Sequence, residues 1–123
     1  MPDNFQNIKI GYINVPRSLS GTIFLNGNNL KTLPEDFGYT NFYRDLFMED
    51  NEIERLLDSF GYLKLLGELN LANNILTDLP YTFKNINVNE NISLERNLFI
   101  TIPPCLTEIN RKPPEIMINH SFL

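Results

Sequence analysis

The sequence predicts an α/β repeat solenoid, in which successive turns of the chain stack on one another and form a parallel β-sheet. Two observations support this prediction. Asparagine recurs at a constant 23-residue step without an insertion, and apolar residues recur around it at the same step. Within each unit apolar and polar residues alternate, which is typical of a short strand with one buried face. The four asparagines are Asn28, Asn51, Asn74 and Asn97.

Each asparagine lies between apolar positions that keep their place in every unit. Two strand positions precede it, and the positions that follow fill the bend and the return segment. One unit cannot bury these side chains alone, so we expect neighbouring units to stack into a continuous core. The columns are Ile23, Leu46, Leu69 and Ile92; Leu25, Met48, Leu71 and Leu94; Leu30, Ile53, Leu76 and Phe99; Leu33, Leu56, Leu79 and Ile102; and Phe37, Phe60, Phe83 and Leu106.

The stretch FLNGNNLKTLP, from Phe24 to Pro34, also fits a different structure. Asn26-Gly27 between apolar residues is typical of a tight β-hairpin turn. The return of the same pattern in three further units favours the repeat instead. We therefore expect Asn26-Gly27 to lie where a strand ends within a repeat.

The recurrent asparagine has a physical reason. Where each strand ends, the chain turns back and leaves backbone amides and carbonyls facing the interior. A buried backbone group without a partner costs about 1–3 kcal/mol. An asparagine side chain carries both a donor and an acceptor, so it can satisfy both kinds of group. The spacing therefore predicts a ladder of stacked asparagines bonded to the backbone.

The 23-residue pattern LxLxxNxLxxLPxxF resembles the leucine-rich-repeat family, from about Thr22 to Ile109. The resemblance implies a short right-handed arc. Its parallel sheet would line the concave face, and extended or 3₁₀ segments would form the convex face. It also implies binding to other proteins and leaves the partner open.

The repeat divides the chain into three segments. We expect four repeats over residues 21–110, preceded by an N-terminal cap or degenerate repeat over residues 1–20. Residues 111–123 are expected to form a C-terminal cap or tail, because Lys112-Pro113-Pro114 breaks regular structure. Ile116 and Met117 could then cover the final repeat, whose apolar end would otherwise be exposed.

Composition excludes several classes of partner and site. A net charge of −5 argues against binding to nucleic acid or to an anionic membrane. The N-terminus is polar, without the apolar segment of a secretory signal, and no run of apolar residues is long enough for a transmembrane helix. A cytoplasmic, intracellular protein is therefore expected. Cys105 is the only cysteine, which excludes an intrachain disulfide.

Function is expected at the outward positions of the strands. Phe24 and Phe47 fall in one outward column, and Asp45, Glu68 and Glu49 lie close to it. An apolar centre surrounded by carboxylates fits a protein partner with a basic or apolar-centred epitope. Alternatively the two rings pack only on each other and the charges only keep the face solvated. The predicted partner-binding residues are Phe24, Phe47, Asp45, Glu49, Glu68, Asn70 and Asn26.

Catalysis is not expected. His120 is the only histidine and lies in the tail, while Cys105 has no histidine near it in sequence. The sequence contains no glycine loop for phosphate and no cluster of metal-ligand spacing, so we expect neither a cofactor nor a metal.

A structural or assembly function is the alternative to partner binding. An incompletely covered end could associate with a second copy, so a monomer and an end-to-end homodimer both remain open. The tail could also dock elsewhere, because Ser121-Phe122-Leu123 is similar to the C-terminal endings that PDZ domains bind.

Overall fold

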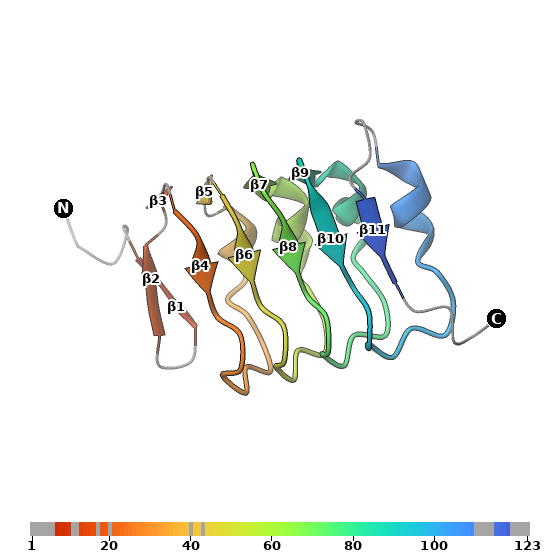
Figure 1. Cartoon of the computed structure of the whole chain (residues 1–123), viewed down its shortest axis with the longest axis horizontal. Helices are drawn as coiled ribbons and strands as arrows, with labels where there is room; N and C mark the ends of the chain where they lie inside the picture. Colours follow the sequence, from red (N-terminus) through yellow and green to blue (C-terminus); the bar gives the residue numbers. More distant parts are fainter. Residues whose placement is uncertain are drawn as a thin grey trace.

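The computed structural model describes residues 7–10, 13–16, 18–19, 21–39, 41–42, 44–109 and 115–118. Its largest element is a five-stranded sheet with the strand order β11-β10-β8-β6-β4. The strands run parallel and lie side by side along the long axis of the molecule (Figure 1). They are β4 (Ile23–Phe24), β6 (Leu46–Phe47), β8 (Leu69–Asn70), β10 (Asn91–Ser93) and β11 (Glu115–Met117).

The register of the sheet follows the repeat interval of the sequence. Ile23 is opposite Leu46, Leu46 is opposite Leu69, and Leu69 is opposite Ile92. Leu46, Leu69 and Ile92 are buried, whereas the residues that follow them point to the other face. The alternation of apolar and polar residues therefore sets which face packs on the core. The predicted parallel sheet is confirmed.

Three further pairs of strands lie outside this sheet. The antiparallel pair β1 (Asn7–Ile10) and β2 (Ile13–Pro16) forms a hairpin within the segment predicted as an N-terminal cap or degenerate repeat. Two parallel pairs lie near the upper edge in Figure 1. These are β3 (Ser18–Leu19) with β5 (Asn41–Phe42), and β7 (Lys64–Leu65) with β9 (Asn87–Val88).

Short 3₁₀ helices pack behind the sheet, on the far side of the core (Figure 1). Every helix in the described part of the chain is of this kind. Phe37, Phe60 and Phe83 come from three of them and are completely buried, and the rings of Phe37 and Phe60 stack with centroids 5.6 Å apart. The helices are η2 (Phe37–Tyr39), η3 (Asp58–Tyr62), η4 (Tyr81–Asn85) and η5 (Pro104–Glu108).

Two glycines allow the first three of these helices to pack closely. A Cβ atom on Gly38 would overlap the carbonyl oxygen of Ser59, and one on Gly61 would overlap that of Thr82. Gly38 and Gly61 occupy the same position in successive units, so the same close contact is made twice. The spacing of η2, η3 and η4 therefore depends on residues that have no side chain.

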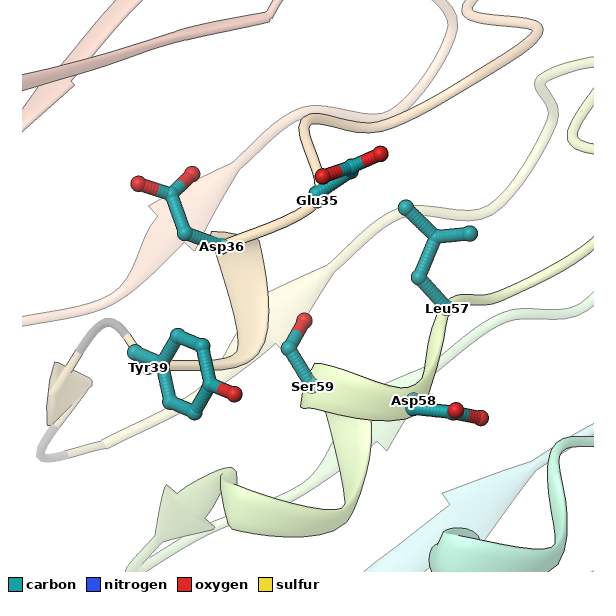
Figure 2. Close-up of a pocket in the computed structure, with 6 residues that line it drawn as sticks. All are labelled: Glu35, Asp36, Tyr39, Leu57, Asp58 and Ser59. Carbon is teal, nitrogen blue, oxygen red and sulfur yellow. The ribbon is translucent and has the colours of Figure 1, made fainter.

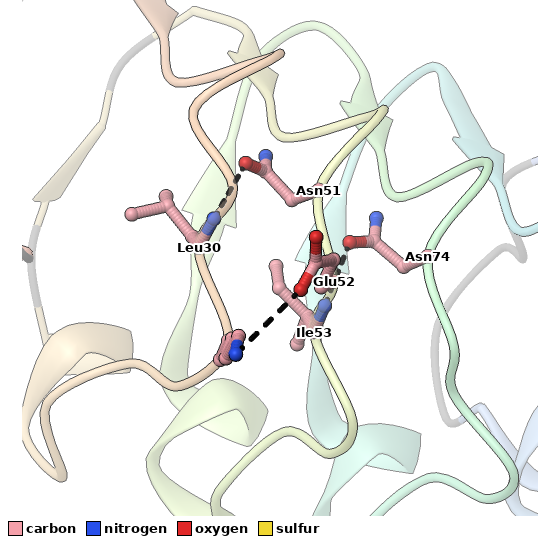
Figure 3. Close-up of polar contacts among 6 residues, drawn as sticks. Leu30, Asn51, Glu52, Ile53 and Asn74 are labelled. Carbon is pink, nitrogen blue, oxygen red and sulfur yellow. Dashed lines mark hydrogen bonds and ion pairs between the residues drawn. The ribbon is translucent and has the colours of Figure 1, made fainter.

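Buried asparagines connect one turn of the chain to the preceding one (Figure 3). Asn51 Oδ1 accepts a hydrogen bond from the Leu30 amide at 2.9 Å, and Asn51 Nδ2 donates to the carbonyls of Leu25 and Met48, both at 3.0 Å. Asn74 and Asn97 make the same kinds of bond one and two units further along. Their acceptor bonds come from the amides of Ile53 and Leu76, and their donor bonds go to Met48 and Leu71 for Asn74 and to Leu71 and Leu94 for Asn97.

Asn28 differs from the other three asparagines. Its side chain is exposed, and its Nδ2 donates to the carbonyl of Asn26 at 3.1 Å. Its own backbone amide donates to Asn51 Oδ1 at 2.9 Å. Asn28 follows the edge strand β4 of the sheet, so its backbone is bonded by the next asparagine while its side chain lies in solvent.

Each of the strands β4, β6, β8 and β10 is followed by a residue with a left-handed backbone. Gly27, Asp50, Asn73 and Arg96 have φ between 55° and 69°, and they occupy the same position in successive units. Gly27 belongs to the Asn26-Gly27 pair, whose alternative interpretation was a hairpin turn, but its amide donates to the Glu49 carbonyl of the next unit at 3.1 Å. The Asn26-Gly27 stretch is therefore the exit from a strand.

The C-terminal segment adds the outermost strand of the sheet. Ile116 of β11 is opposite Ile92 of β10, and the Leu94 amide donates to the Met117 carbonyl at 2.7 Å. Ile116 and Met117 are half-buried. The Lys112-Pro113-Pro114 segment, His120 and the ending Ser121-Phe122-Leu123 lie outside the described residues. Among the residues that the structure describes, no helix is long and apolar enough to cross a membrane.

Candidate functional site

Two phenylalanines lie on the open face of the sheet, which we define as the face opposite the buried strand residues. Phe24 and Phe47 are opposite each other in β4 and β6, and their rings stack with centroids 5.3 Å apart and planes 14° apart. Phe47 is half-buried, whereas Phe24 remains 69 % exposed. The two rings therefore shield each other only in part, and a large apolar surface remains open to solvent.

Asp45 is held in place beside this aromatic pair by one backbone donor and one side-chain donor. Its Oδ1 accepts the amide of Glu68 at 2.8 Å, and its Oδ2 accepts the hydroxyl of Thr22 at 3.1 Å. A Cβ atom on Gly67 would overlap Asp45 Oδ1, so the glycine makes room for the carboxylate. Asp45 thus links three turns of the chain, a structural task that the sequence prediction did not assign to it.

Glu68 lies where several carboxylates come together. It is half-buried, and burial raises its pKa above the ordinary value of 4.5. The negative charges of Asp45, Glu90 and Glu49 raise the pKa of Glu68 further. A cavity of about 380 Å³ adjoins this cluster and is lined by Arg44, Asp45, Leu66, Gly67, Glu68 and Glu90.

Glu49 and Glu95 each keep one carboxylate oxygen out of contact with solvent and with any donor among the described residues. Both lie one strand away from Ala72, on opposite sides of it, because Glu49, Ala72 and Glu95 occupy the same position in successive units. A buried carboxylate oxygen without a donor is costly. A donor from outside the described residues would relieve this cost.

The remaining outward positions differ in exposure. Asn26 is exposed and Asn70 is half-buried, with its Oδ1 accepting the Ala72 amide at 3.0 Å. Ala72 and Ser93 also occupy outward positions in the strand alternation, but both are buried. Both side chains are small, and Ser93 lies between Asn70 and Met117 of the adjoining strands, so its neighbours cover it. The predicted residues therefore gather at the β4–β6–β8 end of the open face.

The surroundings of Cys105 disfavour the reactive form of its thiol. Cys105 is buried, and that burial, with the nearby charges of Asp78 and Glu108, raises the pKa of its thiol. A raised pKa disfavours the thiolate, which is the reactive form. Among the described residues no three His, Cys, Asp or Glu side chains are placed to hold a metal ion.

A second surface, on the side of the 3₁₀ helices, was missed by the sequence prediction. Tyr39 and Tyr62 are 60 % and 62 % exposed, and their rings pack with centroids 5.1 Å apart. Beside Tyr39 is a cavity of about 440 Å³ between η2 and η3 (Figure 2). A signal was present, because Tyr39 and Tyr62 recur at the interval of the repeat. The cavity is lined by Glu35, Asp36, Tyr39, Leu57, Asp58 and Ser59.

The next helix carries a third exposed tyrosine with a different environment. The Nζ of Lys84 lies 4.1 Å from the centroid of the Tyr81 ring and donates to the Tyr81 hydroxyl at 2.7 Å. That hydroxyl donates in turn to Glu108 Oε1 at 3.4 Å. The hydrogen bond with Tyr81 raises the pKa of Lys84. On η4 the chain therefore supplies its own cation to an exposed tyrosine.

Neither a scan against protein-family models nor a search of curated proteins finds a match to this sequence.

Proposed function

We propose that the chain is a short right-handed leucine-rich-repeat solenoid that binds a protein partner through the open, concave face of its sheet. The binding surface is formed by Phe24 and Phe47, with Glu49, Glu68 and Asn70 around them. The observation that supports it most is the exposed aromatic pair on a regular sheet face. Asp45 contributes to this surface through its negative charge alone, because both of its carboxylate oxygens already accept hydrogen bonds within the chain.

The fold part of the proposal is supported by the recurrence of contacts at one interval. Strand pairing, buried phenylalanines, left-handed residues and asparagine hydrogen bonds all recur at the interval of the sequence repeat. Neighbouring turns then bury each other's apolar residues, which is how stacked repeats are stabilised. The leucine-rich-repeat pattern LxLxxNxLxxLPxxF accounts for the strand pairing, the buried phenylalanines and the asparagine hydrogen bonds.

The partner is inferred from the chemistry of the surface. An aromatic centre is typical of the residues that contribute most to binding. Around it, burial and the neighbouring negative charges raise the pKa of Glu68, and Glu49 keeps an oxygen without a donor among the described residues. A lysine or arginine beside an apolar side chain would cover the rings and neutralise these charges. We therefore assign the face to a protein segment that presents a basic residue next to an apolar one.

Replacing both rings tests the proposal. The chain with Phe24→Ser and Phe47→Ser should lose partner capture by about tenfold or more, because the apolar centre of the interface is gone. Its thermal midpoint should change by less than about 3 °C, since Phe24 contributes little to the core. Capture is measured by affinity purification from the native source with quantitative mass spectrometry of the retained proteins.

A matched control comes from another exposed apolar residue. Ile100 is 78 % exposed and lies away from the open face. Ile100→Ser removes a similar apolar side chain and should leave the captured proteins unchanged. Capture that survives the double phenylalanine substitution, or that falls equally in Ile100→Ser, contradicts the proposal.

A structural or assembly function is the second candidate, and one observation favours it. Apolar side chains are exposed together on the last two turns of the described repeat region. They are Ile75, Leu98, Ile100 and Ile102, which are 38 %, 56 %, 78 % and 39 % exposed. Ile102 belongs to a column that is buried in earlier turns, so a second copy stacked on this end would cover it.

A further inference from the structure

The cavity between η2 and η3 combines an aromatic wall with a negative rim. Tyr39 forms one wall and is itself packed against Tyr62, which fixes the position of its ring. Glu35 and Asp58 supply two exposed carboxylates, and no basic residue is among those that line this cavity. Figure 2 shows the carboxylates pointing outward in different directions around the opening. They form a broad negative rim, and they do not converge on a single point as ligands of a metal ion would.

The close packing of the helices creates this arrangement. Gly38 and Gly61 let η2, η3 and η4 approach so closely that an added Cβ atom at either glycine would overlap the backbone of the next helix. This close approach brings Tyr39 and Tyr62 into contact. The Gly38 amide also donates to the buried Ser59 hydroxyl oxygen at 3.1 Å, which fixes the floor of the cavity. The site is thus built from rigid elements and from a tyrosine whose ring has a fixed neighbour.

A contact on η4 shows how an exposed tyrosine beside a carboxylate holds a cation in this chain. Lys84 lies over the ring of Tyr81, whose hydroxyl contacts the carboxylate of Glu108. The residues at the position of Lys84 in the two preceding units are Gly61 and Gly38. Tyr81 occupies the same position as Asp58 and Glu35 of those units, so η2 and η3 have carboxylates where η4 has the tyrosine, and they have no cation where η4 has Lys84. No lysine or arginine is among the residues that line the cavity beside Tyr39, whereas η4 supplies a cation internally.

We propose that this cavity binds the arginine side chain of a protein partner. The planar guanidinium stacks on Tyr39, while its N–H groups donate to carboxylates of the rim. Arginine fits better than lysine, because its flat group can stack and make two parallel hydrogen bonds at once. The site lies across the core from the open face of the sheet and does not depend on the function proposed for that face.

The test is a titration of the full-length, ¹⁵N,¹³C-labelled chain followed by NMR. The probe is the peptide acetyl-Gly-Gly-Arg-Gly-Gly-amide, and two comparison peptides carry citrulline or lysine in place of arginine. Citrulline keeps the shape of arginine and lacks its charge. The arginine peptide should give saturable shifts at Ser59, Leu57 and the Tyr39 ring, with a dissociation constant on the order of 1 mM. The lysine peptide should bind more weakly, and the citrulline peptide should give no saturable shift.

Two charge-matched variants decide whether the cavity is the site. Glu35→Gln with Asp58→Asn neutralises two exposed carboxylates of the rim and should weaken arginine binding by about tenfold. Glu54→Gln with Glu115→Gln removes the same charge from exposed positions outside the cavity and should leave the affinity unchanged. Amide spectra of both variants report whether the fold is retained.

The tyrosine wall has its own variant and its own control. Tyr62→Leu removes the ring that supports Tyr39 and should weaken binding of the arginine peptide severalfold. Phe24→Ser with Phe47→Ser should leave this titration unchanged, which separates the cavity from the open face. Equal binding of the citrulline or lysine peptide, equal weakening by the two charge variants, or no saturable shift at Ser59 and Tyr39 would overturn the proposal.

Discussion

At the scale of single residues, buried asparagines provide hydrogen-bond partners for backbone groups that have none where each strand ends. Asn74 accepts the amide of Ile53 and donates to the carbonyls of Met48 and Leu71, so one side chain contacts three strand ends or bends. Asn74 is 4 % exposed, and water cannot take over these bonds. Most of its contribution to stability is therefore the cost that would arise if the backbone groups lost their partner.

Replacing Asn74 by leucine tests this contribution. Asn74→Leu leaves one buried amide and up to two carbonyls without a partner, so we expect the free energy of unfolding to fall by about 3 kcal/mol. Urea denaturation followed by circular dichroism measures the change. The control is Asn28→Leu in the same column, which should cost far less because the Asn28 side chain is exposed. Equal stability of Asn74→Leu and the parent chain would contradict the ladder.

The sequence pattern did not predict which residues have a left-handed backbone. Gly27 suits a positive φ, and Asn73 and Asp50 tolerate it, but Arg96 gives no such signal. Backbone hydrogen bonds to the next unit hold these turns: the amides of Asp50 and Asn73 donate to the carbonyls of Ala72 and Glu95. Hydrogen bonds between successive units therefore determine a left-handed backbone that the residue type alone does not predict.

At the scale of elements, no strand or helix in the described part of the chain is long enough to be stable alone. The strands of the main sheet are very short, and each 3₁₀ helix is little more than one turn. Each element gains its stability from the equivalent element of the neighbouring turn, as the stacked rings of Phe37 and Phe60 illustrate. Where such contacts are closest, adding a single atom should lower the free energy of unfolding.

Gly61 is the position at which this cost can be measured. A Cβ atom there would overlap the Thr82 carbonyl oxygen and lie 2.8 Å from the Thr82 Cβ, so η3 and η4 would have to separate. We expect Gly61→Ala to lower the free energy of unfolding by about 3 kcal/mol in chemical denaturation.

Gly21 provides the control for this substitution. Nothing lies within 4 Å of a Cβ atom at Gly21. Gly21→Ala should therefore change stability by no more than about 1 kcal/mol. If both alanine variants were equally stable, close packing of the 3₁₀ helices would not limit the spacing between turns.

At the scale of the whole molecule, the end that exposes Leu98, Ile100 and Ile102 decides between monomer and assembly. The assembly candidate predicts a sedimentation coefficient that rises with protein concentration, because a second copy would bury these apolar side chains. Leu98→Ser with Ile100→Ser should then restore a monomer at every concentration. A parent chain that sediments as a monomer throughout would remove self-association at this end.

The sheet could be predicted from the sequence because its register is the interval of the repeat. Once Ile23, Leu46 and Leu69 fall at equal steps, parallel pairing of their strands follows from the need to bury all three on one side. The N-terminal hairpin could not be predicted this way, since residues 7–16 have no counterpart at that interval. The same holds for β11, which joins the sheet after the repeat has ended.

The two candidate surfaces differ in how much of each could be predicted from the sequence. The positions of Phe24 and Phe47 on the open face follow from alternation alone, and the structure adds only how closely the rings stack. The hydrogen bonds of Asp45 depend on the absence of a side chain at Gly67, a contact between separate turns. The recurrence of Tyr39 and Tyr62 marks the second surface in the sequence, but the cavity beside Tyr39 depends on contacts between η2 and η3 that only the structure shows.

The burial of Cys105 has a practical consequence for studying this chain. Its side chain is 3 % exposed, the pKa of its thiol is raised by the surrounding protein, and the sequence contains no other cysteine. A cysteine introduced on the surface would react with maleimide far faster than the native one. Fluorophores or spin labels could thus be attached at a single chosen point on either face, without first deleting the natural sulfhydryl.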